Sequence, residues 1–520
     1  MAGRCTENPL DLYKTKMSTS YGQILKSSSI IGGSTAINLL IGLLRTKVTA
    51  VILGPSGIGI VGLYQSILNL VGAISSLGLN GSGVREVAEA YGTGDTELVG
   101  KVVRVLRITC WATGFFGWVL AASLSLPLSN WIFGSPAQAV PIAVLGAALL
   151  FTSISAGQTA LLQGTRRIRD LAIINIASAS ASTVLSVIIY LWQGVLGILP
   201  VLILTALTTM TISWWFARKI HIPVCRALTI QKTWNHAKRL LSLGIALMWS
   251  GILSTGSFLL ISSHIVREFG LDGNGMYMAA WNLSGLFAGF ILSAMGTDFL
   301  PRLTAVASDN QEISRLVNEQ TEIGMLLALP GIVATLIFAP LIIQLLYSPK
   351  FAPAAELLPW FVLGVFGRVV SWPMGFILVA KGAARWYAAT ETLAAAVHLL
   401  FVWLLTHFIG LKGVPIAFFL LYVLFSLSLN LLTRKLYGFR WTSVVTKIVL
   451  ISSLAAGIAF IVTSTMPSPV ALFFGVILAA LSGIYSMRGI VVRIGTDHRF
   501  VRSLLRIPCM ARILNLGELR

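Results

Sequence analysis

Hydrophobic residues along this chain form long, nearly uninterrupted runs instead of alternating with polar residues. A membrane-spanning helix needs about 20 apolar residues to cross a hydrocarbon core of about 30 Å. Transmembrane strands would instead alternate over segments of about ten residues. The pattern predicts an all-α polytopic membrane protein with about 14 transmembrane helices, centred near Gly42, Leu68, Phe115, Leu149, Ala181, Leu204, Leu253, Phe287, Gly331, Val365, His398, Leu421, Leu454 and Val476.

The composition agrees with a membrane protein. Of the 520 residues, 56% are hydrophobic and only 11% are charged, and the mean hydropathy is +0.85. Ordinary soluble domains have about 25% charged residues. The four cysteines lie far apart, so we expect no disulfide framework among Cys5, Cys110, Cys225 and Cys509.

The formal net charge of +20 is explained by where the basic residues lie. The turns at 54–57, 129–138 and 193–197 carry no charge. By the positive-inside rule the basic turns face the cytoplasm, and an even number of helices places both termini there. The charge therefore reflects topology and does not indicate nucleic-acid binding. The basic turns contain Arg166, Arg167, Arg169, Arg218, Lys219, Arg226, Lys232, Lys238, Arg239, Arg434, Lys435 and Arg440.

The two halves of the chain repeat one pattern at a nearly constant spacing. "LGPSGIG" aligns with "FGLDGNG", which pairs Gly54 with Gly270 at a spacing of 216. Six helices per repeat give both halves the same orientation. We therefore predict two six-helix bundles, related by a parallel internal repeat and facing each other across a central cavity, plus two C-terminal helices. Further matches, at spacings from 213 to 218, pair Ser135 with Ser348, Gly146 with Gly364, Gly164 with Gly382, and Gly194 with Gly410.

These patterns divide the chain into six predicted segments. The tail is basic, and its arginines are spaced among Val, Leu and Ile. We expect it to lie on anionic lipid, with docking of a partner as the alternative. The segments are a cytoplasmic N-terminal segment (1–23), an N-terminal six-helix bundle (24–220), a cytoplasmic linker (221–238), a C-terminal six-helix bundle (239–436), two extra transmembrane helices (437–490) and the basic cytoplasmic tail (491–520).

The first hundred residues resemble a known family. "ILKSSSIIGGSTAINLLIGLLRTKVTAVILGPSGIGIVGLYQSI", followed by "GLNGSGVREVAEAYGTGD", is similar to the start of bacterial oligosaccharide flippases of the O-antigen and exopolysaccharide type. These belong to the multidrug/oligosaccharidyl-lipid/polysaccharide exporter superfamily. The resemblance implies a secondary-type transporter, not an enzyme, in the bacterial cytoplasmic (inner) membrane. It would move undecaprenyl-diphosphate-linked repeat units to the periplasmic leaflet by alternating access, with a polysaccharide polymerase and a chain-length regulator as candidate partners.

Two cations on the first predicted helix are candidate ligands for the diphosphate. Arg45 occupies the place of a cation in the lipid II flippases of this superfamily, whereas the cation that they carry two turns earlier is replaced by "AINLL". Arg45 and Lys47 lie roughly 10 to 13 Å before Gly54, so snorkelling to the interface is the alternative. Their spacing also directs them about 200° apart on a straight helix.

Arg368 is the strongest candidate for binding the cargo. It lies ~18 to 20 Å from the charged residues at both ends of its run, which is too far for snorkelling. Its match at a spacing of 218 is Leu150, so the repeated fold does not require the arginine. A structural ion pair is the alternative interpretation.

Sugar recognition needs hydrogen-bonding amides and aromatic faces. Gln65 and Asn69 lie on one polar stripe of the second helix, and Trp281 and Asn282 fall at the corresponding level of the second repeat. Packing between helices explains such stripes equally well.

Glu391 and His398 are candidates for energy coupling. They are seven residues apart and therefore share one helix face, as in a proton or cation relay. A local hydrogen-bonded pair is the alternative. We find no nucleotide-binding motif and no metal-ligand cluster in the sequence, so we expect no cofactor, and a proton gradient, a sodium gradient or the membrane potential would drive transport.

Three other functions fit parts of this pattern. The first keeps the fold and changes the cargo, which gives a multidrug/toxin extruder or a lipid II flippase. The second is a membrane glycosyltransferase or polymerase, which would need a large outward loop with acidic catalytic residues, whereas the outward loops here are short and acid-poor. The third is a non-transporting scaffold of the export apparatus.

Overall fold

The computed structural model describes residues 9–76, 79–220, 230–466 and 468–494. Every regular element in these ranges is an α-helix or a short 3-10 helix, and ten segments are long and apolar enough to cross a membrane. The predicted all-α polytopic membrane protein is confirmed. Four of the ten segments contain a break at a glycine, so the predicted count of fourteen helices stays a prediction.

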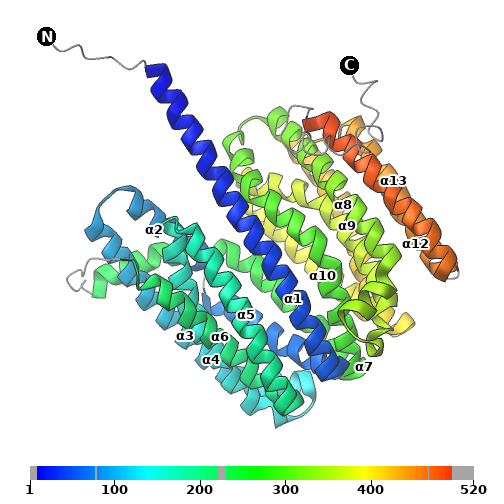
Figure 1. The fold of residues 1–520 in the computed structure, drawn as a ribbon, viewed down its shortest axis with the longest axis horizontal. Helices are drawn as coiled ribbons and strands as arrows, with labels where there is room; N and C mark the ends of the chain where they lie inside the picture. The colour runs from blue at the N-terminus through cyan, green and yellow to red at the C-terminus, as the bar shows by residue number, and fades with distance from the viewer. Residues whose placement is uncertain (1–8, 77–78, 221–229, 467, 495–520) are drawn as a thin grey trace. The chain divides into compact units, whose positions relative to one another are not determined.

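The helices follow the same order in the two halves of the chain (Figure 1). The first half contains α1 (Pro9–Ser76), α2 (Leu79–Gly92), α3 (Thr96–Phe133), η1 (Pro136–Gln138), α4 (Ala139–Gly164), α5 (Ile168–Gln193), η2 (Gly194–Gly197) and α6 (Ile198–Ala217). The second half contains α7 (Ile230–Ala305), α8 (Asn310–Leu346), η3 (Pro349–Phe351), α9 (Ala354–Ala380), α10 (Ala384–Ile409), η4 (Gly410–Lys412) and α11 (Gly413–Tyr437). The last two helices are α12 (Ser443–Thr465) and α13 (Ser468–Ile494).

The chain folds into two compact units. The N-terminal unit comprises Met1–Leu53 and Ile60–Leu259, and the C-terminal unit comprises Gly54–Gly59 and Leu260–Arg520. The first part of α7 therefore belongs to the N-terminal unit. Residues 1–8 of the predicted N-terminal segment, 221–229 of the predicted linker and 495–520 of the predicted tail lie outside the described residues.

Backbone geometry repeats between the halves at the predicted spacing. Gly54 breaks α1 with φ 68° and ψ −171°, and Gly270 breaks α7 with φ 72° and ψ −177°. Only glycine adopts such a conformation without steric cost. Asp95 and Asp309 each accept two backbone N–H bonds at the starts of α3 and α8. The two halves thus share local geometry as well as element order.

One predicted match has to be corrected by two residues. Arg166 adopts φ 58° and is the counterpart of Gly382, at φ 66°, so the turns after α4 and α9 match at a spacing of 216. The pattern of buried and exposed residues over 145–152 and 361–368 is also identical at this spacing. The counterpart of Arg368 is therefore Thr152 and not Leu150.

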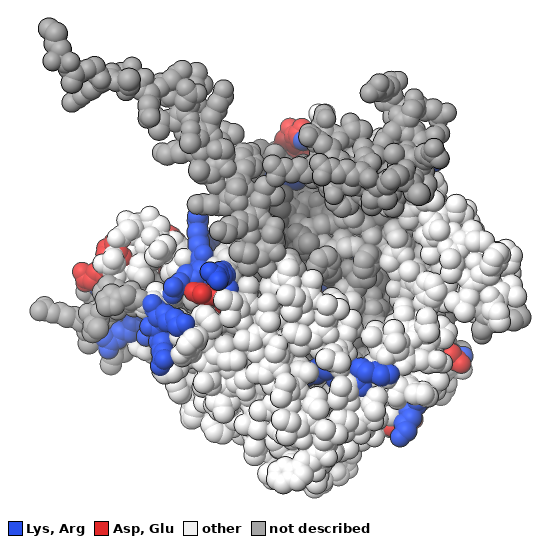
Figure 2. Space-filling model, in the orientation of Figure 1, with Lys and Arg blue, Asp and Glu red and all other residues white. Residues whose placement is uncertain are grey.

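In the N-terminal unit, basic side chains gather at one end, as Figure 2 shows. Where the structure describes the side chains of this unit, the cations other than Arg45 and Lys47 lie on α2, near the start of α3 or α5, in the turn after α4, or just after α6. This distribution is what the positive-inside rule predicts for a cytoplasmic end. The orientation in the membrane stays a prediction.

Helices α9 and α11 pack closely in the C-terminal unit. A Cβ on Gly364 would overlap the ring of Phe418, and one on Gly367 would lie 2.9 Å from Cβ of Tyr422. The Ser426 hydroxyl also donates a 3.1 Å hydrogen bond to the carbonyl of Gly367. Small residues and interhelical hydrogen bonds are typical of helix contacts in membranes. This contact fixes the part of α9 that carries Arg368.

Helices α12 and α13 pack against α8 of the C-terminal unit. Arg493 on α13 forms a 2.5 Å ion pair with Glu322 on α8, and both side chains are mostly buried. A Cβ on Gly489 would lie 2.8 Å from the side chain of Leu326. The two extra helices are therefore held to the bundle by a charge pair and by close packing.

Candidate functional site

Arg368 lies near the middle of α9, and its side chain is exposed. The next two residues, Val369 and Val370, are buried, so the arginine emerges from the side of α9 that is not covered by this unit's core. A cation at mid-depth in hydrocarbon costs ~2.5 to 3.5 kcal/mol on insertion scales. The Arg368 side chain therefore requires water or polar groups around it.

Two polar groups from neighbouring helices accompany Arg368. Its positive charge interacts with Glu391 on α10 and with Tyr422 on α11, and Glu391 also interacts with Tyr422. We call these three residues the charged cluster. All three are described residues, and no direct ion pair within 4.0 Å joins Arg368 to Glu391. The guanidinium is thus close to a negative charge but keeps hydrogen-bond donors for another anion.

An aromatic wall adjoins the charged cluster. The Trp281 ring lies 5.0 Å from that of Phe418 and 5.5 Å from that of Phe361, between centroids. The ring centroid of Tyr422 lies 4.9 Å from that of Phe418, so the wall contacts the charged cluster through Phe418. Trp281 is half-buried, and the neighbouring Asn282 is exposed and hydrogen-bonds the hydroxyl of Tyr347. Both predicted sugar ligands of the second repeat therefore have partners within the fold.

His398 lies against the same wall, with its ring 5.8 Å from that of Phe418. Its Nε2 is buried and has no hydrogen-bond partner among the described residues. Glu391 lies two turns away on the same helix, and the charge that acts on it is that of Arg368. A relay between Glu391 and His398 stays a prediction.

Arg45 is held by a tyrosine of its own unit. Its side chain is half-buried and hydrogen-bonds Tyr190 at the end of α5. In the second repeat Thr406, the counterpart of Tyr190 at a spacing of 216, lies 2.8 Å through Oγ1 from Nε2 of His264, whereas the counterpart of Arg45 is Ile261. Lys47 is also half-buried and has an interaction of its own. Arg45 thus joins the first and fifth helices of its repeat.

The predicted amides of the N-terminal half are exposed. Nε2 of Gln65 donates a 3.1 Å hydrogen bond to Oδ1 of Asn69, and both side chains lie on the accessible side of α1 after its break. Each amide keeps further donors or acceptors. They remain available to a sugar or to water.

The structure also adds two tyrosines that the sequence did not single out. Tyr422 completes the charged cluster, and Tyr190 holds Arg45. Each is one aromatic residue within an apolar run, where a tyrosine is an ordinary packing residue. No pattern in the sequence distinguishes them.

Comparison with known protein families shows the family to which the chain belongs. Residues 48–356, more than half of its length, match the family described as polysaccharide biosynthesis protein. The chain belongs to this family. This polysaccharide biosynthesis protein is also similar to the lipid III flippase of Escherichia coli (strain K12), with 21% identity over 421 residues, which cover 77% of this chain and 96% of that protein. The lipid III flippase of Shigella flexneri matches with the same values.

Solved structures show the same fold. A multidrug resistance MATE family transporter of the MOP superfamily, in an inward-facing conformation, matches with a TM-score of 0.64 and 18% identity over 77% of this chain and 94% of its own. The lipid II flippase MurJ, in an inward closed conformation, matches with a TM-score of 0.62 and 13% identity over 90% of this chain and 99% of its own. At these identities the likeness concerns the fold alone.

Proposed function

We propose that this polysaccharide biosynthesis protein is a flippase for lipid-linked oligosaccharides. It moves undecaprenyl-diphosphate-linked repeat units from the cytoplasmic to the periplasmic leaflet of the bacterial inner membrane by alternating access. The observation that carries this proposal is the similarity to a lipid III flippase over 96% of that protein's length. Membership of a polysaccharide biosynthesis family supports the glycan part of the cargo, and the cargo makes the polymerase and the chain-length regulator candidate partners.

The charged cluster suits the anionic part of such a cargo. A planar guanidinium forms paired hydrogen bonds with phosphate oxygens and stays charged at any accessible pH. Glu391 balances the charge of Arg368 when no cargo is present, which lowers the cost of an intramembrane cation. A diphosphate would take the place of this carboxylate as the partner of Arg368.

The other predicted site residues have smaller roles in this proposal. Arg45 and Lys47 add positive potential in the N-terminal unit, although Arg45 is already hydrogen-bonded to Tyr190. Gln65 and Asn69, which are exposed, offer amide groups to the sugars, and Trp281 offers a ring face. The site would therefore bind the sugars weakly, through these amides and the ring face, and the diphosphate strongly, through the cations.

Deletion of the gene tests the proposed function. In a strain without a redundant flippase, deletion should abolish surface polysaccharide and leave lipid-linked repeat units on the cytoplasmic leaflet. Leaflet-specific labelling of the repeat units measures this directly. Normal arrival of these units at the outer leaflet would refute the proposal, and rescue of a strain lacking its lipid II flippase would assign the chain a different lipid-linked cargo.

We further propose that Glu391 couples transport to a proton gradient. Protonation of Glu391 would release Arg368 to bind the diphosphate, with His398 assisting on the same helix. Glu391→Gln should make transport independent of the proton gradient and lower its rate, because the amide cannot take up or release the coupling proton. Glu356→Gln is the control, because Glu356 forms an exposed surface ion pair with Lys412. Unchanged gradient dependence in Glu391→Gln would remove this residue from the coupling.

A further inference from the structure

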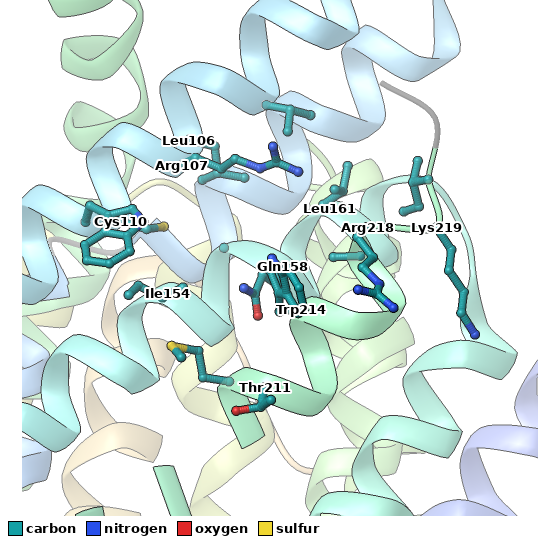
Figure 3. A pocket seen from close by; sticks show the side chains of 16 residues that line it. Leu106, Arg107, Cys110, Ile154, Gln158, Leu161, Thr211, Trp214, Arg218 and Lys219 are labelled. Atoms are coloured by element: carbon teal, nitrogen blue, oxygen red, sulfur yellow. The ribbon is translucent and has the colours of Figure 1, made fainter. Parts of the chain in front are cut away.

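A pocket lies inside the N-terminal unit and contains no residue of the charged cluster. Its volume is about 790 Å³, and it is bounded by α3, α4 and α6 (Figure 3). Pockets that bind small molecules typically measure about 300 to 1,000 Å³. The size alone therefore admits a ligand as large as a lipid headgroup with part of its acyl chains.

The pocket has a cationic rim and an apolar wall. The rim consists of Arg107 on α3 together with Arg218 and Lys219 just after α6, and all three side chains are exposed. The wall consists of aliphatic and aromatic side chains of the three helices, including Leu106, Trp111, Ile154, Leu161 and Trp214. Figure 3 shows Arg107 above Gln158 and Trp214, and Arg218 and Lys219 to one side of them.

Aromatic rings hold two of the rim cations in place. The guanidinium of Arg218 lies 4.9 Å from the ring centre of Trp214, and Nζ of Lys219 lies 3.5 Å from that of Trp215. Such contacts orient a cation without neutralising it. Within the described ranges no carboxylate forms an ion pair with any of the three rim residues. The rim therefore presents uncompensated positive charge.

The position of the pocket favours an amphiphile over a soluble anion. Its wall belongs to helices of three candidate membrane spans, whereas Arg218 and Lys219 of the rim lie just after α6, among the basic positions of this unit. Trp111 and Trp214 are both more than half exposed, as is typical of tryptophans at a membrane interface. Gln158 accepts a hydrogen bond from the Ser213 hydroxyl, so its NH₂ group remains available as a donor.

We propose that this pocket binds an anionic phospholipid. The lipid phosphate lies on Arg107, Arg218 and Lys219, Gln158 donates to the headgroup, and one acyl chain follows the apolar wall between α3 and α6. Anionic lipids are concentrated in the cytoplasmic leaflet, which is the leaflet that the positive-inside rule assigns to this end of the unit. The site does not depend on the identity of the transported cargo.

Native mass spectrometry of the purified full-length protein tests the site. The probes are phosphatidylglycerol and phosphatidylcholine of matched chains, added to delipidated protein. The wild type should bind phosphatidylglycerol in preference. The Arg107→Ala/Arg218→Ala variant should lose about thirtyfold of that preference, since two basic residues near a membrane surface together contribute about 2 kcal/mol. Thr211→Trp should block the cavity and lower the binding of the same lipid without a change of charge.

The control variant is Arg166→Ala/Arg169→Ala, which removes two exposed cations of the same unit that do not line the pocket. It should keep the wild-type preference for phosphatidylglycerol. Equal losses in the control and pocket variants would show general charge attraction and overturn the proposal. Displacement of the lipid by inorganic phosphate at the same concentration would also overturn it, because the acyl chain would then contribute nothing.

Discussion

The two halves of the repeat share a backbone but differ in what they carry at mid-depth. At the common spacing of 216, Arg368 corresponds to Thr152, Glu391 to Asn175 and Tyr422 to Ala206. The charged cluster therefore occurs in one half only, and the shared fold forms without it. Because charges inside a membrane are costly, an unshared cluster of this kind is a candidate functional site.

The features that both halves share indicate structure. The glycine breaks of α1 and α7 have nearly the same dihedral angles. Tyr190 and its counterpart Thr406 each hydrogen-bond the first helix of their repeat, at Arg45 and at His264, which are not matched positions. Comparison of matched positions thus separates residues that the shared fold requires from residues that it does not require.

The largest expected effect concerns the unshared arginine. Arg368→Ala should lower transport by at least about a hundredfold, or about 2.7 kcal/mol, since bonds to charged groups contribute about 1.5 to 3 kcal/mol each. Arg368→Lys should retain part of the activity, because lysine keeps the charge but loses the paired hydrogen bonds. Leaflet-specific labelling of lipid-linked repeat units measures the rate.

Arg385→Ala is the control for this experiment, since it removes an exposed cation at the start of α10. It should transport at nearly the wild-type rate. If Arg368→Ala also did so while present in normal amounts in the membrane, Arg368 would be a structural residue and the contrast between the halves would lose its functional meaning.

The next effect concerns glycines that both halves share. Within the C-terminal unit, a Cβ on Gly59 would overlap the carbonyl of Leu271, and one on Gly275 would overlap the carbonyl of Pro55. Overpacking typically costs about 1 to 3 kcal/mol, and backbone atoms yield less than side chains, so Gly59→Ala and Gly275→Ala should each cost about 2 to 3 kcal/mol.

Thermal unfolding of the purified variants measures this cost. Gly285→Ala is the control on the same helix, because a Cβ there has no neighbour within 4 Å. A large loss in only one of the two glycine variants would show that the repeat is not symmetric at this contact.

The sequence predicted the fold more completely than the site. Long apolar runs and the recurrence of Gly54 at Gly270 sufficed for the helices and the duplication, because membrane helices need only length and hydrophobicity. The register of α4 against α9 was two residues off because Gly164 was matched to Gly382, although the left-handed position of the first turn is occupied by Arg166. Matching glycines in the sequence fails where a residue other than glycine adopts the left-handed conformation.

The candidate site depended on contacts between helices, which periodicity does not encode. Depth along the helix singled out Arg368, and its partner Glu391 was found as a separate candidate. That these two residues belong to one cluster, and that Tyr190 engages Arg45, follows only from the packing of neighbouring helices.

The hydrogen bonds that Tyr190 and its counterpart Thr406 form with the first helix of each repeat should differ in strength. Tyr190→Phe leaves the charge of half-buried Arg45 without this partner and should cost about 1.5 to 2 kcal/mol, because hydrogen bonds to charged groups are the stronger ones. Thr406→Val removes the partner of His264 and should cost about 1 kcal/mol.

Shifts in the thermal midpoint, measured beside transport, distinguish two roles of Arg45. A loss of stability in Tyr190→Phe with normal transport would support a structural role. A loss of transport with an unchanged midpoint would contradict it and would return Arg45 to the cargo site.

The smallest expected effect concerns the turn where the halves differ in one residue. Arg166 holds φ at 58°, whereas its counterpart Gly382 adopts φ 66°. A left-handed conformation costs a non-glycine residue about 1 to 2 kcal/mol, and glycine loses about 0.5 to 1 kcal/mol through its greater freedom when unfolded. Arg166→Gly should therefore stabilise the N-terminal unit by about 0.5 kcal/mol, and Gly382→Ala should destabilise the C-terminal unit by about 1 kcal/mol.

Arg166→Ala is the matched control, because it removes the same charge and keeps the strained backbone, so its thermal midpoint should lie below that of Arg166→Gly. Equal midpoints for these two variants would mean that the loss of charge, and not the backbone conformation, determines the stability of this turn.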